Sequence, residues 1–104
     1  MESLDERRFG GIARLYGESG FARIRAAHVV VVGVGGVGSW AAEALARSGV
    51  ARLSLIDLDV VAPSNLNRQA QATLASVGGN KVDAMAARIH AFAPDCSVSP
   101  IDDF

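Results

Sequence analysis

Hydrophobic residues along this chain fall into short unbroken runs that alternate with stretches of helical periodicity. The four valines of residues 29–32 follow His28 and are typical of a strand buried on both faces of a parallel sheet. From Val37 to Ser48 apolar and small residues recur at helical spacing, and Gly49 ends that pattern. Residues 52–57 then predict a second strand that ends in an acid.

A second helix and a third strand follow in the same order. Apolar residues recur at helical spacing from Val82 to Ala93, Pro94 ends the pattern, and residues 97–101 predict a strand. Strands that alternate with helices predict an α/β fold, here a Rossmann-like nucleotide-binding βαβ unit with a parallel sheet. We expect this domain to occupy residues 28–104.

Residues 1–27 predict an N-terminal helical arm in front of that domain. A short polar helix opens it, and Gly10 and Gly11 are expected to break that helix. Residues 18–20 predict a turn, and a helix from Phe21 leads into the first strand.

Composition narrows the class of protein. Half of the 104 residues are hydrophobic and a fifth are charged, which is typical of a globular domain. The net charge of −1 gives no argument for a broad nucleic-acid surface, although it leaves a local patch open. The single cysteine, Cys96, the lack of a signal peptide and the absence of a membrane-spanning run favour a cytoplasmic protein without membrane contact. Three strands are few for a nucleotide-binding sheet, so we expect the N-terminal part of a longer chain.

The clearest motif lies between the first strand and the first helix of the domain. Gly33, Gly35 and Gly38 read G-x-G-x-x-G, and the helix that follows offers free N–H groups and a partial positive charge to a phosphate. An acid that binds ribose belongs about 20 residues further on, where Asp57 lies. The plainer alternative is that the glycines only permit close packing of helix and strand.

Two basic residues follow at the same expected edge of the sheet. The loop of residues 58–69 leaves the carboxyl end of the second strand, and the planar fork of Arg68 suits a phosphate. A polar connector without a ligand explains this loop equally well. Lys81 lies in a first helical turn, where the helix dipole disfavours a cation, which indicates a bound anion. No metal-ligand spacing occurs, so we assign no metal ligand.

The motifs together resemble one family. In order they are Gly33-Val-Gly-Gly-Val-Gly38, Asp57-x-Asp59, Ser64-Asn-Leu-Asn-Arg-Gln69 and Lys81. This combination resembles the adenylating enzymes related to ubiquitin-activating enzyme, the ThiF/MoeB/HesA group, and it covers the chain from about Arg8 onward.

The resemblance implies that ATP and Mg²⁺ are the cofactors. The residues that it implies for nucleotide binding are Gly33, Gly35, Gly36, Gly38, Asp57, Ser64, Asn65, Arg68 and Lys81. Among them, Asp57 holds the ribose, whereas Asn65, Arg68 and Lys81 contact the triphosphate. Asp59 is expected to support these residues without contacting the nucleotide itself.

The catalytic residues implied by the resemblance are Arg68, Lys81 and Arg14. The first two neutralise charge as pyrophosphate leaves. An arginine near the N-terminus reaches into the partner's site in a homodimer; this is Arg14, with Arg8 as the alternative.

One subgroup, the tRNA threonylcarbamoyladenosine dehydratases, resembles residues 8–17 and 35–47 more closely. It implies adenylation of the threonyl carboxylate of a modified adenosine in the tRNA anticodon loop, followed by closure of an oxazolone ring. The implied partners are tRNA, a second copy of the chain and a sulfur-transfer protein. In this subgroup an aspartate for nucleotide and Mg²⁺ lies beyond Phe104, so we expect no turnover from these 104 residues alone.

Three other functions stay open at this point. They are a sulfur-carrier adenylyltransferase of the same family, an NAD-binding module of an oxidoreductase, and a non-catalytic dimerisation unit. An NAD module should tolerate changes at Arg68 and Lys81, whereas a response to tRNA separates the dehydratase from a carrier-protein enzyme.

Overall fold

The computed structural model describes residues 3–103 and shows one parallel sheet with helices. Its elements are α1 (Leu4–Ala26), β1 (His28–Val32), α2 (Gly38–Arg47), β2 (Arg52–Ile56), η1 (Pro63–Asn67), α3 (Lys81–Phe92) and β3 (Ser97–Ile101). The α/β class and all three predicted strands are confirmed. Met1, Glu2 and Phe104, at the ends of the expected arm and domain, lie outside the described residues.

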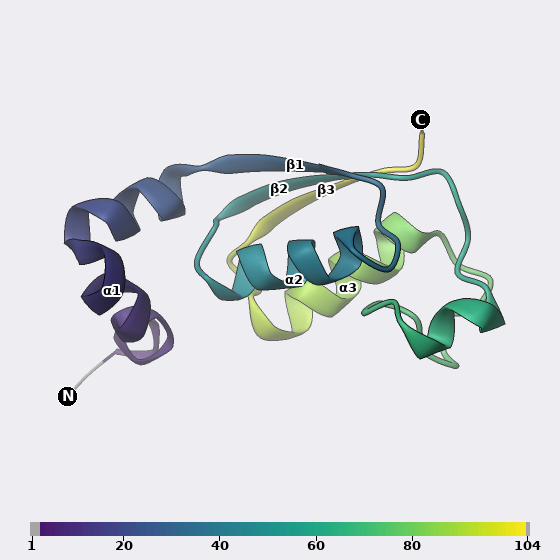
Figure 1. Ribbon diagram of the computed structural model, residues 1–104, viewed down its shortest axis with the longest axis horizontal. Helices are drawn as coiled ribbons and strands as arrows, with labels where there is room; N and C mark the ends of the chain where they lie inside the picture. The colour runs from purple at the N-terminus through teal and green to yellow at the C-terminus, as the bar shows by residue number, and fades with distance from the viewer. Residues whose placement is uncertain (1–2, 104) are drawn as a thin grey trace.

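The three strands lie in the order β1-β2-β3 and are all parallel. In the register, Val30 lies opposite Ser54, which in turn lies opposite Ser99. Figure 1 shows the sheet as one layer and α2 with α3 as a second layer beneath it. Because the strands are parallel, their carboxyl ends all meet at one edge, and the glycine turn leaves the sheet there.

The core lies between the sheet and these two helices. Leu53 and Leu55 of the central strand are fully buried against Met85 and Ile89 of α3. The side chains that α2 contributes to the core are small, namely Ala42 and Ala46. They let the backbone of α2 approach the sheet closely. The helical face predicted from Val82 onward is therefore confirmed as the core face of α3.

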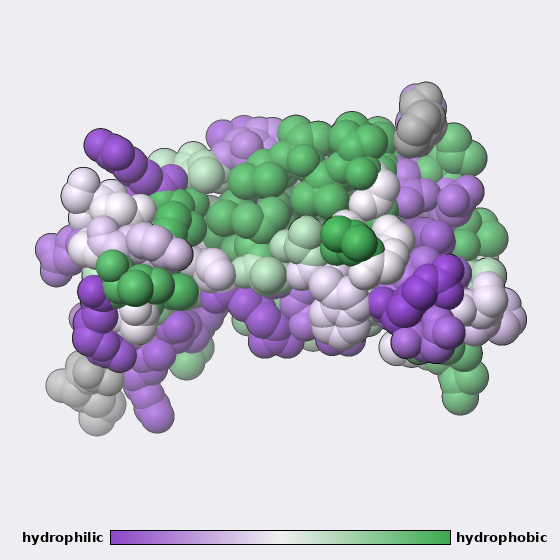
Figure 2. Space-filling view, in the orientation of Figure 1, coloured by the Kyte–Doolittle hydropathy of each residue, from purple (hydrophilic) through white to green (hydrophobic). Residues whose placement is uncertain are grey.

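The other face of the sheet is open, which corrects the expectation for the first strand. Val30 and Val32 are 51% and 63% exposed, so β1 is not buried on both faces within residues 3–103. The opposite valines of the strand, Val29 and Val31, pack against the core. Figure 2 shows hydrophobic side chains gathered along the strands, with hydrophilic ones below them over α3. Four consecutive valines indicated two buried faces, yet only one is covered here.

The arm forms a single helical segment with one kink, and the kink is not where the sequence predicted it. The helix continues through Gly10 and Gly11 and through the predicted turn at residues 18–20, and it breaks only at Gly17, with φ 77°. A capping box between Ser3 and Glu6 starts the helix. No helix within residues 3–103 combines the length and apolar character that crossing a membrane needs.

Aromatic packing explains why the early glycines do not break α1. Phe9 is buried, and its ring lies 5.4 Å from that of Phe21 on the other side of the kink. That contact needs a continuous helix up to a single bend, and Gly17 supplies the bend because only glycine adopts its left-handed φ without strain. Asp95 fastens the arm to the body through ion pairs with Arg8 at 3.3 Å and Arg25 at 3.1 Å.

An ionic bridge joins α2 to α3. Glu43 is buried, and its carboxylate accepts hydrogen bonds from Arg88 on α3 and, at 3.3 Å, from Arg47 on its own helix. The hydrogen bond from Arg88 lowers the pKa of Glu43 below its ordinary value.

The turn from β1 into α2 depends on one glycine for its shape. A Cβ atom at Gly38 would lie 1.8 Å from the carbonyl oxygen of Gly33, which is far inside contact distance. A Cβ at Gly36 would meet only the side chain of Arg68, at an ordinary 3.5 Å. The packing interpretation of the motif is thus correct for Gly38.

Replacing Gly38 with alanine should destabilise the fold by about 3 kcal/mol, because the new methyl group forces helix and strand apart. Gly36→Ala is the matched control and should change the free energy of unfolding by less than about 0.5 kcal/mol. Urea denaturation of both variants measures the difference. Equal stabilities of the two variants would show that the turn can accommodate a methyl group at Gly38, which would contradict the structure.

Acid should weaken the α2–α3 bridge. A carboxylate whose pKa is lowered in the folded state stabilises the fold above its unfolded pKa, and that contribution disappears as the pH falls through the folded value. We expect Glu43→Gln to lose about 1–2 kcal/mol at pH 7, and the gap from wild type to close below about pH 4. Urea unfolding from pH 7 to pH 3 measures this, with the exposed Glu18→Gln as control. A gap that does not change with pH would contradict the bridge.

Candidate nucleotide-binding site

The glycine turn continues β1 and delivers the chain to the start of α2. The N–H of Gly33 still donates to the carbonyl of Ile56 at 2.8 Å, as a strand residue would. Val34 then turns inward and is fully buried. Gly35 and Gly36 follow at the N-terminus of α2, where backbone N–H groups and the helix dipole suit an anion.

Asp57 orients this turn from the end of β2. Its Oδ2 accepts the N–H of Val34 at 2.8 Å, and its Oδ1 accepts the N–H of Asp59 at 2.9 Å. The residue is 8% exposed, so it is largely enclosed by the edge of the sheet. The predicted ribose ligand therefore also has a structural role, which the spacing of the motif did not reveal.

The segment after η1 is bound to the glycine turn and to the first turn of α2 by three side-chain hydrogen bonds. Trp40 Nε1 donates to the carbonyl of Arg68 at 2.6 Å, and Ser39 Oγ accepts the N–H of Ala70 at 3.1 Å. Gln71 Nε2 donates to the carbonyl of Val34 at 2.8 Å. Sequence reasoning assigned nothing to Ser39, Trp40 or Gln71, because no local pattern links positions about 30 residues apart.

The peptide groups on either side of Val34 are consequently held by two buried side chains, a feature we call the Val34 clamp. Asp57, at the end of β2, accepts the N–H of Val34, and Gln71 donates to the carbonyl of Val34. Gln71 is 2% exposed and also donates to Gln69 at 3.2 Å. Its Oε1 has no hydrogen-bond partner in the described part of the chain. Buried polar groups of this kind fix one geometry when they are paired.

Arg68 lies over the glycine turn. A Cβ atom added at Gly36 would have the Arg68 side chain as its nearest neighbour, with Cδ of Arg68 at 3.5 Å. Arg68 Nη1 donates to the carbonyl of Ser64 at 3.0 Å and to Oδ1 of Asn67 at 3.1 Å. These two bonds to its own loop fix the orientation of the guanidinium. The residue is exposed. The structure thus brings Arg68 and the turn together, as the loop position predicted.

Asn65 and Ser64 differ in their availability. Asn65 is buried, and its Oδ1 accepts the N–H of Ala62 at 2.8 Å, so the side chain shapes η1. Ser64 is exposed at the surface of the same turn. Both lie in the loop that carries Arg68, and their contact with a nucleotide stays a prediction.

Lys81 is brought to the same edge by pairing between two loops. Val60 and Asn80 form an antiparallel bridge, and the N–H of Lys81 donates to the carbonyl of Asp59 at 3.0 Å. Lys81 is 8% exposed. Nevertheless, no acid within residues 3–103 forms an ion pair with it. A buried cation without an acidic partner is costly, which favours a site shaped for an anionic ligand.

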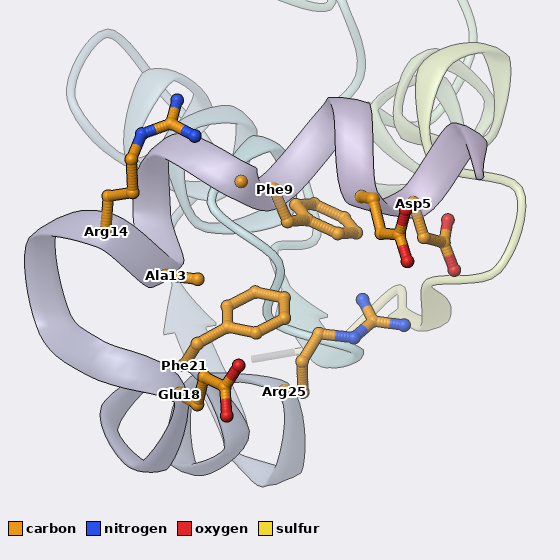
Figure 3. Close-up of a pocket in the computed structure, with 9 residues that line it drawn as sticks. Asp5, Phe9, Ala13, Arg14, Glu18, Phe21 and Arg25 are labelled. Carbon is orange, nitrogen blue, oxygen red and sulfur yellow. The ribbon is translucent and has the colours of Figure 1, made fainter. Parts of the chain in front are cut away.

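The N-terminal arginines lie elsewhere in the molecule. Arg14 is exposed on α1, which Figure 1 shows at the opposite end of the molecule from the glycine turn. It lines a hollow of about 510 Å³ between the two halves of α1, and Figure 3 shows Phe9 and Phe21 facing each other there. Within one copy, neither Arg14 nor Arg8 is brought to the site.

Neither a cluster of metal-ligating side chains nor an exposed thiol occurs among residues 3–103. No group of three His, Cys, Asp or Glu side chains able to hold a metal occurs among residues 3–103. Cys96 is buried, its Sγ donates to the carbonyl of Val50 at 3.4 Å, and burial raises the pKa of its thiol. Cys96 is therefore a core residue, as the sequence indicated.

The chain is similar to known proteins along most of its length. Residues 10–104 match the model of the ThiF family. The chain is 50% identical over 99 residues to the tRNA threonylcarbamoyladenosine dehydratase of Haemophilus influenzae, covering 95% of this chain and 38% of that one. It is 36% identical over 91 residues to the molybdopterin-synthase adenylyltransferase of Salmonella typhimurium, covering 88% of this chain and 36% of that one.

A solved structure of a tRNA N6-threonylcarbamoyladenosine dehydratase is also similar to this chain. The crystal structure of Escherichia coli tRNA N6-threonylcarbamoyladenosine dehydratase in complex with ATP matches with a TM-score of 0.93 and 50% identity. The match covers 99% of this chain and 42% of that one. The chain thus spans about two fifths of the length of these dehydratases.

Removing the donor of the Val34 clamp should loosen the turn. Gln71→Leu keeps the volume but leaves the Val34 carbonyl buried and unpaired, which should cost about 1–3 kcal/mol of unfolding free energy. Leu74→Gln, at a position 87% exposed in the same segment, is the control and should change little. Chemical denaturation measures both variants, and an unchanged Gln71→Leu would contradict the clamp.

Proposed function

The chain belongs to the ThiF family, and on that premise we propose that it is the ATP-binding region of an enzyme that adenylates a carboxylate on tRNA. The substrate is the threonyl carboxylate of N6-threonylcarbamoyladenosine, and the product is the cyclic oxazolone derivative. The proposal rests on identity to curated dehydratases over most of this chain and on the site described above.

One observation favours a triphosphate over other nucleotides. Lys81 is buried and forms no ion pair within residues 3–103, at the edge where Arg68 lies over Gly36. Two cations and a helix N-terminus at one edge suit a ligand with several negative charges. A nicotinamide dinucleotide has only its pyrophosphate at such a turn and needs neither cation.

The nucleotide would lie along the carboxyl edge of the sheet. The backbone of Gly35 and Gly36 faces the phosphates, and Gly33 and Gly38 shape the turn that presents them. Asp57 accepts one N–H on each oxygen, so each oxygen keeps a lone pair for a ribose hydroxyl. Asn65, Ser64 and Asp59 support the loop around the triphosphate.

The chemistry needs charge stabilisation more than acid–base catalysis. A carboxylate oxygen attacks the α-phosphorus of ATP, the bond to the bridging oxygen of the β-phosphate breaks, and pyrophosphate leaves. Arg68 and Lys81 stabilise the charge that develops on the leaving group. The carbamoyl oxygen then attacks the carboxyl carbon, the bond from that carbon to the oxygen of AMP breaks, and a carbamoyl N–H proton is lost. The carboxylate oxygen leaves on AMP, so the net change in the adenosine is loss of water.

Mg²⁺ is proposed to enter with the triphosphate. Magnesium binds oxygen ligands and is commonly held by one or two carboxylates together with substrate phosphates. The described residues offer no cluster of three metal-ligating side chains, so we assign no step to the metal.

The proposed assembly is a homodimer in the cytoplasm. Arg14, or alternatively Arg8, would complete the site of a second copy, since neither approaches the glycine turn of its own chain. A sulfur-transfer protein is a further proposed partner, by analogy with carrier-protein enzymes of the family.

Substitution of the two cations tests the proposal. In the protein that carries this chain, Arg68→Ala and Lys81→Ala should each slow AMP formation by about 100-fold, because each removes a donor to the developing charge. Release of AMP from labelled ATP, with and without bulk tRNA, measures this, and mass spectrometry of the adenosine reports loss of water. Arg52→Ala, exposed at the start of β2, is the control with wild-type activity.

Each other outcome has a distinct meaning. Near-wild-type activity in both variants would overturn the triphosphate assignment. ATP turnover that ignores tRNA would indicate a carrier-protein adenylyltransferase. Tight NAD binding without ATP turnover would mean that the turn serves an oxidoreductase.

A further inference from the structure

Arginine and aromatic side chains form an unbroken line of contacts along α2 and α3. The guanidinium of Arg47 lies 3.9 Å from the ring centroid of Phe92, and that of Arg88 lies 5.9 Å from the ring of Trp40. Glu43 joins the two arginines, since its carboxylate accepts a hydrogen bond from each. We call these five side chains the Arg–aromatic strip.

The strip leads directly to the candidate site. Trp40, at one end, donates its indole N–H to the carbonyl of Arg68, the residue that covers Gly36. At the other end, Arg47 and Phe92 line a hollow of about 200 Å³ together with Arg8. A continuous series of contacts therefore runs from Phe92 on α3 to Arg68, which covers the glycine turn.

The strip offers positive charge and flat surfaces to solvent, whereas its one acid is hidden. The side chains of Arg47 and Arg88 are 55% and 36% exposed, but that of Glu43 is only 10% exposed. Trp40 is 49% exposed. Each arginine uses Nε for Glu43, and within residues 3–103 neither uses its Nη groups in another hydrogen bond. The Nη groups of both arginines therefore remain for a ligand.

This combination fits RNA better than other anionic partners. Guanidinium Nη groups donate to phosphate oxygens, and exposed rings or guanidinium planes stack with unpaired bases. An acidic peptide would satisfy the charges and leave the ring of Trp40 without a stacking partner. The glutamate between the arginines holds both forks in a fixed orientation, which lowers the entropy lost on binding.

We propose that the Arg–aromatic strip binds the backbone and unpaired bases of RNA next to the nucleotide that enters the site. The inference rests on the proposed function, because it assigns to that function the surface that holds the tRNA. The net charge of the chain is only −1, so a local patch of this kind would determine where the RNA lies.

Two variants test the strip in different ways. Arg47→Gln removes one guanidinium while Arg88 still pairs with Glu43. The double variant Glu43→Gln/Arg88→Gln removes the second guanidinium and leaves the net charge unchanged. We expect each to weaken tRNA binding about tenfold, as for one lost charge-assisted contact, and Arg47→Gln to reduce the salt slope by about one.

The matched control is Arg23→Gln on the last turn of α1, which removes the same charge as Arg47→Gln but lies off the strip. Fluorescence anisotropy with labelled tRNA at several salt concentrations measures affinity. ATP affinity without RNA should match wild type in every variant, and the thermal midpoints of Arg47→Gln and Arg23→Gln should stay close to wild type. The midpoint of the double variant should fall because the α2–α3 bridge is lost, so its RNA affinity is measured well below that midpoint. In AMP formation, the KM for tRNA should rise while kcat changes little.

The outcomes separate the two proposals. Wild-type protein that binds tRNA and strip variants that bind it equally well would overturn the strip and leave the proposed function intact. An equal loss in Arg23→Gln would show a general charge effect and also overturn it. Altered oligomeric state in the strip variants, with affinity following that state, would assign the face to a second copy. Wild-type protein that binds no RNA would overturn both proposals.

Discussion

The two hydrogen bonds of the Val34 clamp are the constraint on which the candidate site depends. Asp57 comes from the end of β2 and Gln71 from the segment after η1, and both act on the peptide groups of one buried residue. If either bond were absent, a buried N–H or carbonyl would be unpaired, at a cost comparable with a large share of the stability of a small domain. The glycine turn, the edge of β2 and the segment that carries Arg68 therefore have to form together.

The parallel sheet explains why these parts can meet at all. Parallel strands end at one edge, so the glycine turn after β1 and Asp57 after β2 are neighbours in space. Lys81 does not follow a strand, and the bridge between Val60 and Asn80 carries it back to that edge. Lys81 is buried and forms no ion pair among residues 3–103, an arrangement that opposes the stability of the free fold.

The sequence predicted what local patterns encode. Helical spacing gave α2 and α3, apolar runs gave the strands, and the glycine motif with Asp57 gave the turn and its edge. It failed where distant residues decide the outcome. The kink of α1 lies at Gly17 because Phe9 packs on Phe21, and the open face at Val30 depends on which elements cover the sheet. The roles of Gln71 and Trp40 were missed for the same reason, since their partners lie about 30 residues away in the chain.

Trp40 connects the two proposals physically. Its indole N–H donates to the carbonyl of Arg68, while the guanidinium of Arg88 lies near its ring, so one side chain contacts both the loop that carries Arg68 and the rest of the Arg–aromatic strip. A ligand that stacks on this ring would act on the backbone of Arg68 through a single rigid group with two side-chain torsions. RNA bound on the strip and ATP bound at the turn would then favour the same position of Arg68. Such coupling is reciprocal, so ATP should increase the affinity for RNA by the factor by which RNA increases the affinity for ATP.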